Sequence, residues 1–415
     1  MKRLAFFLLL SGTFIVMAVP AHGQTFSVLY AFRGKHGLAP EGDLILDHSG
    51  NVYGTTAGGG NATACGVSGC GVVFKLKRSG GETILYDFAG GSDGAAPQGR
   101  LVRDKSGNIY GTTSDGGDFG WGTIYKLDKS GVETVLYTFT GGTDGGFPVA
   151  NLLRDGEGNL YGTTFNGGDL TACDGQGCGV VFKLDAMGVY SVLYTFTGGA
   201  DGANPAAGLV RDGLGNLYGT TYAGGNLSIC NFRGCGVVFK VRPTGKEIVL
   251  HTFMLGTDGG NPDNSGLVRD SAGNFYGTTA NGGNISHCGG GGCGVIFKLD
   301  ASGNNFTVVY DFVGKTQGNH PFSGVILDEA GNFYGTTYMG GSRLCEDNEG
   351  CGTVFKVDSA GNYTKLYTFT GMTDGAYPGG LAMDATGALY GTTLLGGDLS
   401  HCHGYGCGVV FKVIP

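Results

Sequence analysis

Several features common in other proteins are missing from this chain, and each absence excludes a class of function. After residues 4–19, no second apolar run is long enough to cross a membrane. The formal net charge is −8 and no stretch is rich in lysine and arginine, which argues against nucleic acid or anionic lipid as a partner. No segment spaces its apolar residues as a helix would. No nucleophile elbow, zinc-protease, phosphate-loop or dinucleotide-binding motif occurs, so we assign no catalytic residue, cofactor or metal.

Residues 1–23 have the composition of a secretory signal peptide. Lys2 and Arg3 precede the apolar run, and the small-residue stretch Ala21-His22-Gly23 suits cleavage before Gln24. The alternative, an uncleaved anchor, is less favoured because residues 4–19 are short for a membrane span. No cysteine lies near the cleavage point, which argues against a lipid anchor. We therefore expect a secreted or periplasmic monomer with no membrane span after cleavage.

The remaining chain is one sequence repeated seven times. The tetrapeptide Tyr-Gly-Thr-Thr begins at Tyr53, Tyr110, Tyr161, Tyr218, Tyr276, Tyr334 and Tyr390. The successive gaps are 57, 51, 57, 58, 58 and 56 residues, so the period is that of one supersecondary unit. The period leaves no room for a second domain, and residues 24–415 are expected to form a single one.

Each unit reads as four short strands, as residues 191–246 illustrate. Four short runs are each bounded by Gly, Asp, Asn or Pro. They are the alternating run at 191–196, the run Gly-Leu-Val-Arg-Asp that ends at Asp212, the run 216–221 and the run 236–241. We expect an all-β fold, a seven-bladed β-propeller with four antiparallel strands per blade and Gly-Leu-Val-Arg-Asp innermost. The last unit lacks an outer strand, and residues 27–32 supply it in a three-plus-one ring closure. A linear solenoid and two separate sandwiches are the alternatives.

The repeated motif string resembles a known family. The repeated unit contains the runs Leu-Tyr-x-Phe, Gly-Gly-x-Asp-Gly-x-x-Pro, Gly-Asn-Leu-Tyr-Gly-Thr-Thr and a run like Gly-Gly-Val-Phe-Lys-Leu. This string is similar to the GloVer-type tandem repeats of exported bacterial proteins. The resemblance covers essentially all of residues 24–415, and it implies export and a repeat fold but no activity. The paired glycines after Tyr-Gly-Thr-Thr are also similar to kelch blades, at the level of the blade only.

The twelve cysteines form six close pairs in the loops between second and third strands. The pairs are Cys65/Cys70, Cys173/Cys178, Cys230/Cys235, Cys288/Cys293, Cys345/Cys351 and Cys402/Cys407. The second unit, which is the 51-residue one, lacks both cysteines, as expected if partners bond to each other. In an exported chain, six local disulfides are the favoured interpretation. The alternative is zinc half-sites, with His287, His401 and His403 beside cysteines.

The loops from fourth to first strands share a face with the cysteine loops in a propeller, and this face carries our candidate ligand-binding residues. Five of these loops contain an Asp-Gly pair, with Asp93, Asp144, Asp201, Asp258 and Asp374. They could bind a cation or sugar hydroxyls, although Asp-Gly also satisfies turn geometry by itself. The copies His36-Gly37 and Gln317-Gly318 lack the carboxylate. Trp121, the only tryptophan, lies in the loop without cysteines, where it could contact a ligand or fill the space of the missing ring.

Aspartates also end every inner strand, at Asp47, Asp104, Asp155, Asp212, Asp270, Asp328 and Asp384. We interpret these as turn residues, because a Gly-Asn turn follows six of them. Four consecutive copies carry an arginine just before the aspartate: Arg103, Arg154, Arg211 and Arg269. These arginines could form an arc that holds an anion, but ion pairing with the neighbouring aspartate is favoured.

These observations favour an exported binding or scaffold protein that contacts an extracellular polysaccharide or protein through the cysteine-loop face. The alternative is a propeller enzyme, a lyase or glycoside hydrolase acting on extracellular carbohydrate. An enzyme would have to break the seven-fold pattern with polar residues. The breaks visible in the sequence are Trp121, a group of Arg343, Glu346, Asp347 and Glu349, and the pair His401 and His403.

Overall fold

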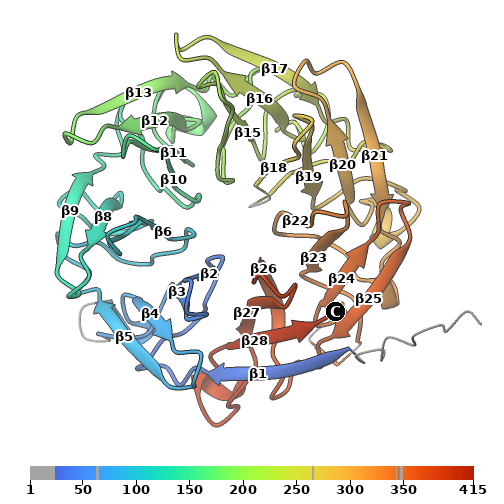
Figure 1. The fold of residues 1–415 in the computed structure, drawn as a ribbon. Helices are drawn as coiled ribbons and strands as arrows, with labels where there is room; N and C mark the ends of the chain where they lie inside the picture. The colour runs from blue at the N-terminus through green and yellow to red at the C-terminus, as the bar shows by residue number, and fades with distance from the viewer. Residues whose placement is uncertain (1–23, 62–64, 264–265, 343, 346–348) are drawn as a thin grey trace, which may run out of the picture.

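Seven four-stranded antiparallel sheets surround a central channel (Figure 1). The structure is a computed structural model that describes residues 24–61, 65–263, 266–342, 344–345 and 349–415. Within those ranges the only helices are short 3-10 turns: η1 (Gly66–Ser68), η2 (Cys173–Gly175), η3 (Cys288–Gly290), η4 (Lys315–Gln317) and η6 (Cys402–Gly404). None of the helices in the described segments is long and apolar enough to span a membrane. The predicted signal peptide lies outside the described residues and stays a prediction.

The strand order within each sheet follows the chain from the channel outward, as the sequence predicts. The inner strands are β2 (Ile45–Leu46), β6 (Val102–Arg103), β10 (Leu153–Arg154), β14 (Val210–Arg211), β18 (Val268–Arg269), β22 (Ile326–Leu327) and β26 (Ala376–Met383). The second strands are β3 (Val52–Thr56), β7 (Ile109–Thr113), β11 (Leu160–Thr164), β15 (Leu217–Thr220), β19 (Phe275–Thr279), β23 (Phe333–Thr337) and β27 (Leu389–Leu395).

The two outer layers complete each blade. The third strands are β4 (Val72–Leu76), β8 (Thr123–Leu127), β12 (Val180–Leu184), β16 (Val237–Val241), β20 (Val295–Leu299), β24 (Thr353–Val357) and β28 (Val409–Ile414). The outermost strands are β5 (Glu82–Asp87), β9 (Glu133–Thr138), β13 (Tyr190–Thr195), β17 (Glu247–Thr252), β21 (Phe306–Asp311), β25 (Tyr363–Thr368) and β1 (Thr25–Ala31). A β-bulge interrupts the pairing of third and outermost strands in every blade, which adds twist to the blade edge.

The Tyr-Gly-Thr-Thr repeat is explained by packing inside each blade. In the fourth blade, the Tyr218 hydroxyl donates to Asp212 Oδ2 at 3.0 Å. A side chain on Gly219 would lie 2.7 Å from the Phe239 ring, so glycine lets the third strand's phenylalanine cross the second strand. The Thr221 hydroxyl donates a hydrogen bond to the backbone oxygen of Ala223 and accepts one from the backbone amide of Val237, the first residue of the third strand. The motif is therefore structural, and its repetition does not mark seven active sites.

The ring closes by pairing the first strand with the last, as predicted. Strand β1 pairs antiparallel with β28, and the two lie side by side in Figure 1. Phe26 of β1 stacks on Tyr367 of the preceding blade with ring centroids 3.6 Å apart. The solenoid and two-sandwich alternatives are wrong, because each of the seven hydrophobic clusters joins residues of neighbouring blades around the whole ring.

Candidate functional site

The cysteine loops and the loops that join successive blades lie on one face, which we call the Cys-loop face. Ala203, in the loop leading into the fourth blade, forms a β-bridge with Ala223 in that blade's cysteine loop. Gly198, in the same joining loop, lies directly against the sulfurs of Cys173 and Cys178. The opposite face, which we call the turn face, carries the tight turns such as the one from Asp212 to Asn216.

The six predicted cysteine pairs are disulfides in the structure. Each joins residues five or six positions apart, with Cα atoms 5.1 to 5.5 Å apart. No cysteine in the described part of the chain is free, so the zinc interpretation of these residues is wrong. The disulfides indicate an oxidising environment.

The two cysteines of a pair differ in their surroundings. The first cysteine of each pair is partly exposed, whereas the second is at most 1% exposed and packs in the hydrophobic cluster between two blades. These buried cysteines are Cys70, Cys178, Cys235, Cys293, Cys351 and Cys407. They are buried because each directly precedes the glycine that leads into the third strand of its blade. They cannot contact a ligand, and each disulfide anchors its loop to the core.

Trp121 takes the place of a disulfide in the second blade. Its backbone oxygen accepts the Phe147 amide, as the Cys178 oxygen accepts the Asn204 amide in the next blade. Its indole lies directly against Gly141, the counterpart of Gly198. Trp121 therefore fills the space of the missing ring, as one of the two interpretations of its position requires. Its other predicted role, contact with a ligand, stays a prediction.

The five candidate aspartates bind their own loops. Asp201 accepts hydrogen bonds from the Tyr194 hydroxyl at 2.9 Å and from the backbone and hydroxyl of Thr197 at 2.8 and 2.6 Å. The same backbone contact recurs at Asp93, Asp144, Asp258 and Asp374. In one of the two copies that lack the carboxylate, Gln317 accepts the hydroxyl of Tyr310 instead. Within the described residues these aspartates form no metal-binding cluster with one another. Their predicted contact with a ligand stays a prediction.

The inner-strand aspartates hold the turns of the opposite face. Asp212 accepts from two backbone amides, from the Asn216 amide and from the Tyr218 hydroxyl. Burial raises the pKa of this carboxyl, but the hydrogen bonds from Asn216 and Tyr218 outweigh it and lower the pKa. The interpretation of these residues as turn residues agrees with this geometry.

The four arginines do not pair with those aspartates. In the part of the chain that the structure describes, no carboxylate oxygen lies within 4.0 Å of their guanidinium groups. Three of them instead lie over a tyrosine ring of the preceding blade, and Arg269 lies over Phe275 of its own blade, at 5.4 to 5.8 Å from the ring centroids. The favoured ion-pair interpretation is therefore wrong, and the arginines keep their charge unneutralised.

Two half-buried glutamates lie where neighbouring blades meet. Glu133 begins β9 and Glu247 begins β17, and one carboxylate oxygen of each is buried without a hydrogen-bond partner. Burial, followed by the negative charge of Asp93, raises the pKa of Glu133 to about 7. Burial and the charge of Asp201 raise the pKa of Glu247 likewise to about 7. Both groups therefore titrate near neutral pH.

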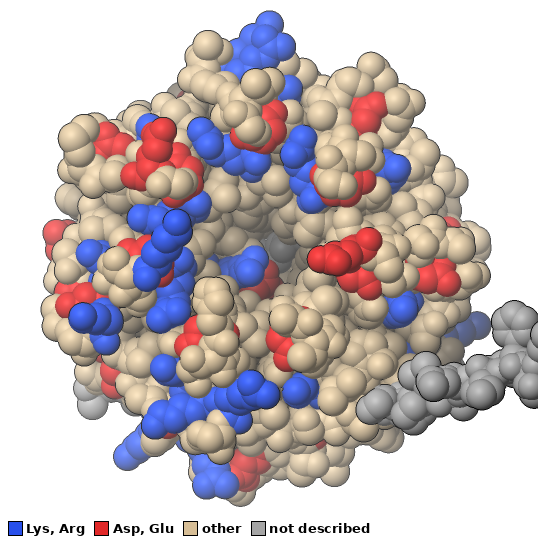
Figure 2. Space-filling view, in the orientation of Figure 1, with Lys and Arg blue, Asp and Glu red and all other residues tan. Residues whose placement is uncertain are grey.

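The channel forms a cavity of about 1500 Å³ lined by the inner strands. Its lining includes Asp270 and Asp328 at the turns, so the cavity reaches the turn face. In Figure 2, acidic and basic side chains are intermixed around the central hollow. Toward the Cys-loop face the channel narrows to a space of about 40 Å³. Asp43, Asn151, Gly208 and Gly380 line both spaces and so form the constriction between them.

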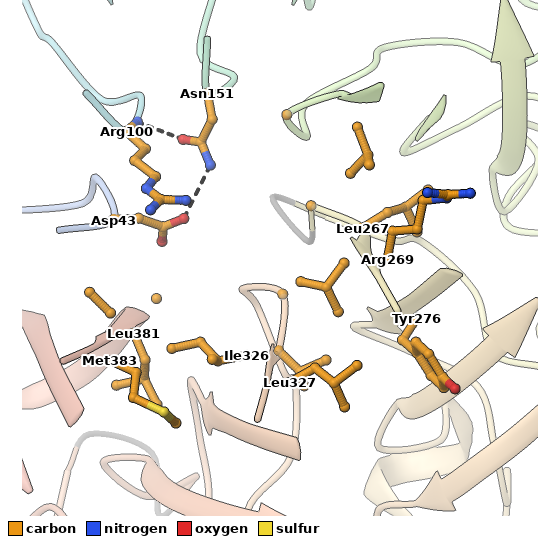
Figure 3. A pocket seen from close by; sticks show the side chains of 18 of the residues that line it. Asp43, Arg100, Asn151, Leu267, Arg269, Tyr276, Ile326, Leu327, Leu381 and Met383 are labelled. Atoms are coloured by element: carbon orange, nitrogen blue, oxygen red, sulfur yellow. Dashed lines mark hydrogen bonds between the residues drawn. The ribbon is translucent and has the colours of Figure 1, made fainter. Parts of the chain in front are cut away.

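The constriction breaks the seven-fold pattern, and sequence reasoning missed it. The residue before the inner-strand Leu or Val is Asp43, Arg100 and Asn151 in the first three blades. In the other four blades it is Gly208, Gly266, Gly324 and Gly380. Asn151 donates to Asp43 Oδ2 at 3.1 Å and accepts the Arg100 backbone amide at 2.5 Å (Figure 3). Aligning the seven copies column by column would have shown this asymmetry.

Surrounding protein sets the charge of the constriction. Burial raises the pKa of Asp43, and the nearby Arg100 charge and the Asn151 hydrogen bond oppose that shift. The Asp43 carboxylate lies directly against the Cα of Gly380, so a side chain at Gly380 would not fit. One carboxylate, one guanidinium and one amide therefore lie on a single arc of the channel, and the other four blades have glycine at the same position.

The irregular residues outside the channel have simpler surroundings. Arg343, Glu346 and Asp347 lie outside the described residues. Glu349 is exposed, and its backbone oxygen accepts the Gly340 amide. His401 contacts Asp398 at 3.3 Å within its own loop.

Exposed apolar side chains gather on the Cys-loop face. Every blade presents at least one from its loop between second and third strands: Val67, Phe119, Leu170, Leu227, Phe232, Ile285, Leu344 and Tyr405. Val67 is 94% exposed and Phe232 is 84% exposed. In the turns of the opposite face such residues occur only at Val132, Met187, Val189 and Leu214 among the described positions.

The fold and the stapled loops define a disulfide-bonded seven-bladed β-propeller. The chain belongs to the Gloeobacter/Verrucomicrobia repeat family, which it matches over residues 11–173, 62–287, 156–344 and 231–415. The predicted resemblance is thereby confirmed. A search of curated proteins finds no match.

Solved structures share the fold at low sequence identity. The extracellular domain of a putative hybrid two-component system from B. thetaiotaomicron has a TM-score of 0.55 at 11% identity, covering 94% of this chain and 41% of that one. The chain thus spans less than half the length of that protein. Oligogalacturonate lyase from Vibrio parahaemolyticus has a TM-score of 0.56 at 10% identity, covering 94% of this chain and 96% of that one. These similarities show a shared fold alone.

Proposed function

We infer that this protein is an exported binding or scaffold module that contacts an extracellular partner through its Cys-loop face. The observation that carries this inference is the exposed apolar side chain that each blade presents there. Exposed apolar groups on one face are a common property of interaction surfaces. Disulfides hold six of the seven loops in shape, so less conformational entropy is lost when they bind.

A protein is the favoured partner, rather than a polysaccharide. Most of the exposed apolar side chains in these loops are aliphatic or phenylalanine, and they carry no hydroxyl or amide to pair with a sugar. Protein interfaces bury such side chains within a polar rim. The aspartates of the joining loops would then shape the surface, because their carboxylates bind the loops themselves.

Charged substitutions on the two faces test this inference. A triple variant, Val67→Asp, Phe232→Asp and Leu344→Asp, places charge on the Cys-loop face at residues that are 94%, 84% and 71% exposed. The matched control, Met187→Asp with Leu214→Asp, changes residues of similar exposure, 87% and 84%, on the turn face. Immobilised native and variant proteins are compared for capture of the source organism's exported proteins and for retention of soluble polysaccharides.

The inference predicts that the triple variant loses a specific bound protein while the control and the native protein retain it. Equal capture by both variants would contradict it. The alternative function, an enzyme acting on extracellular carbohydrate, is addressed by measuring product release from the same polysaccharides. Turnover that both variants keep would favour the enzyme.

A further inference from the structure

The channel has the features of a second binding site, separate from the Cys-loop face. Its volume is about 1500 Å³, and it narrows at the constriction formed by Asp43 and Asn151. Volumes of this size accommodate ligands larger than a single sugar or amino acid. At the position before the inner-strand Leu or Val, Asp43, Arg100 and Asn151 break the seven-fold pattern, and this arc lies at the constriction.

The polar arc offers two complementary groups to the cavity. Asn151 is engaged at both ends, because it donates to Asp43 and accepts the Arg100 backbone amide. It is therefore a positioning residue. The Arg100 side chain is exposed within the channel and has no carboxylate within 4.0 Å among the described residues. A guanidinium in this state can bind a carboxylate through two parallel hydrogen bonds, and the adjacent Asp43 can accept hydroxyl groups.

The residues that line the channel differ in charge from blade to blade. Arg103, Arg154 and Arg269 line the cavity on the second, third and fifth blades, with their charges unneutralised. The first, sixth and seventh blades carry Leu46, Leu327 and Met383 at the same position. Figure 3 shows Ile326, Leu327, Leu381 and Met383 together, across the cavity from Arg100 and Asn151. Arginines thus predominate on one side of the cavity and aliphatic residues on the other, while Asp270, Asp328 and Glu329 also line it at the turn face.

We propose that the channel binds an acidic oligosaccharide, with the carboxylate of its terminal sugar on Arg100 and the hydroxyls beside it on Asp43. Carboxylates farther along the chain meet the cationic wall, and the C–H faces of the rings pack on the aliphatic wall. A phosphate ligand is less suited to this site, because the Asp43 carboxylate would repel a dianion more strongly than it repels the single charge of a sugar carboxylate. A neutral sugar would offer Arg100 no charge-assisted hydrogen bond.

The test is calorimetric titration of the whole protein with two trisaccharides that differ only in their carboxylates. The β-1,4-linked trimer of mannuronic acid should bind, and β-1,4-mannotriose should bind at least tenfold more weakly. Rising NaCl concentration should weaken the acidic trimer's binding. Pyrophosphate, which has charge but no hydroxyl groups, should not compete at the same concentration.

Single substitutions locate the site. Arg100→Gln should weaken binding of the acidic trimer about ten- to hundredfold, the effect of losing a hydrogen bond to a charged group. Arg78→Gln removes the same charge from an exposed turn of the turn face, outside the cavity lining, and should leave the affinity unchanged. Thermal melting of each variant verifies that the ring is folded. Equal affinity for the two trimers, no measurable binding, or an equal effect of Arg100→Gln and Arg78→Gln would overturn the proposal. The Cys-loop variants should leave this affinity unchanged, so failure here is distinguishable from failure of the proposed function.

Discussion

Ring closure can be measured by comparing two phenylalanines that occupy equivalent positions. Phe32 follows β1, the closing strand, and Phe196 follows β13 in the middle of the chain. Both are fully buried. The Phe32 ring lies 5.1 Å from Phe74, and the Phe196 ring lies 5.1 Å from Phe239, in the same edge-on arrangement. Their backbone amides donate to equivalent oxygens at 3.0 and 3.1 Å.

Because their surroundings match, replacing either Phe32 or Phe196 with alanine should lower the free energy of unfolding by the same amount. Phe→Ala in a packed core lowers the free energy of unfolding by about 3–5 kcal/mol, through lost transfer energy and the cavity that remains. This is a large part of the roughly 5–15 kcal/mol that stabilises a typical domain. We expect Phe32→Ala and Phe196→Ala to agree within about 1 kcal/mol, since neither site can collapse more easily than the other. Leu29→Ala, at a residue of β1 that is 37% exposed, should cost much less.

Urea unfolding provides the measurement. Trp121 is the only tryptophan, so its fluorescence reports unfolding of the second blade, while far-ultraviolet circular dichroism reports all seven. Coincident transitions are required before the midpoints are converted to free energies. If Phe32→Ala costs under about 1 kcal/mol while Phe196→Ala costs about 3 kcal/mol or more, the first strand does not close the ring and the reasoning fails.

Three further predictions concern the interfaces between blades. The raised pKa values of Glu133 and Glu247 mean that the folded state holds their protons more tightly than the unfolded chain does. The free energy of unfolding should therefore fall as the pH rises from about 4.5 to about 7, and then level off. A variant with both glutamates replaced by glutamine should show a smaller fall in melting temperature over this range, and an unchanged profile would contradict the assignment. Replacing both Cys173 and Cys178 with alanine should lower the free energy of unfolding by about 2 kcal/mol, because the disulfide closes only a short loop. An unchanged urea midpoint would refute the view that the disulfide stabilises the fold. Trp121→Ala should lower the free energy of unfolding by about 2 kcal/mol, which is less than for a fully buried tryptophan, because the indole is half-buried. Reductant should lower the melting temperature of this variant as much as that of the native protein. A smaller effect would show that the indole and the disulfides do not stabilise the ring independently.

The fold could be predicted from the sequence because its signals are local and repeated. The period of Tyr-Gly-Thr-Thr fixed the number of blades, and the run at residues 27–32 matched the strand missing from the last unit. The disulfide pairing followed from the second unit, where both cysteines are absent together. Each of these inferences needs only neighbouring residues or a comparison of copies.

The site could not be predicted in the same way, because its contacts join distant parts of the chain. Asn151 reaches Asp43 across 108 residues, and this contact exists only because the ring brings the first and third blades together. The pKa of Glu133 is raised by burial and by Asp93, which lies 40 residues earlier in the loop that joins the first and second blades. The arginines were assigned to the wrong partner for a related reason. Their side chains turn to an aromatic ring, in most cases on the preceding blade, instead of the aspartate next to them in sequence.

Amide hydrogen exchange tests most directly whether the Cys-loop face is the binding surface. Exchange is measured for the native protein alone and bound to the exported protein that it captures. The account predicts slower exchange in the cysteine loops and joining loops of several blades, and no change in the turns on the opposite face. Protection confined to those turns or to the inner strands around Arg100 would contradict it, because binding would then take place through the channel.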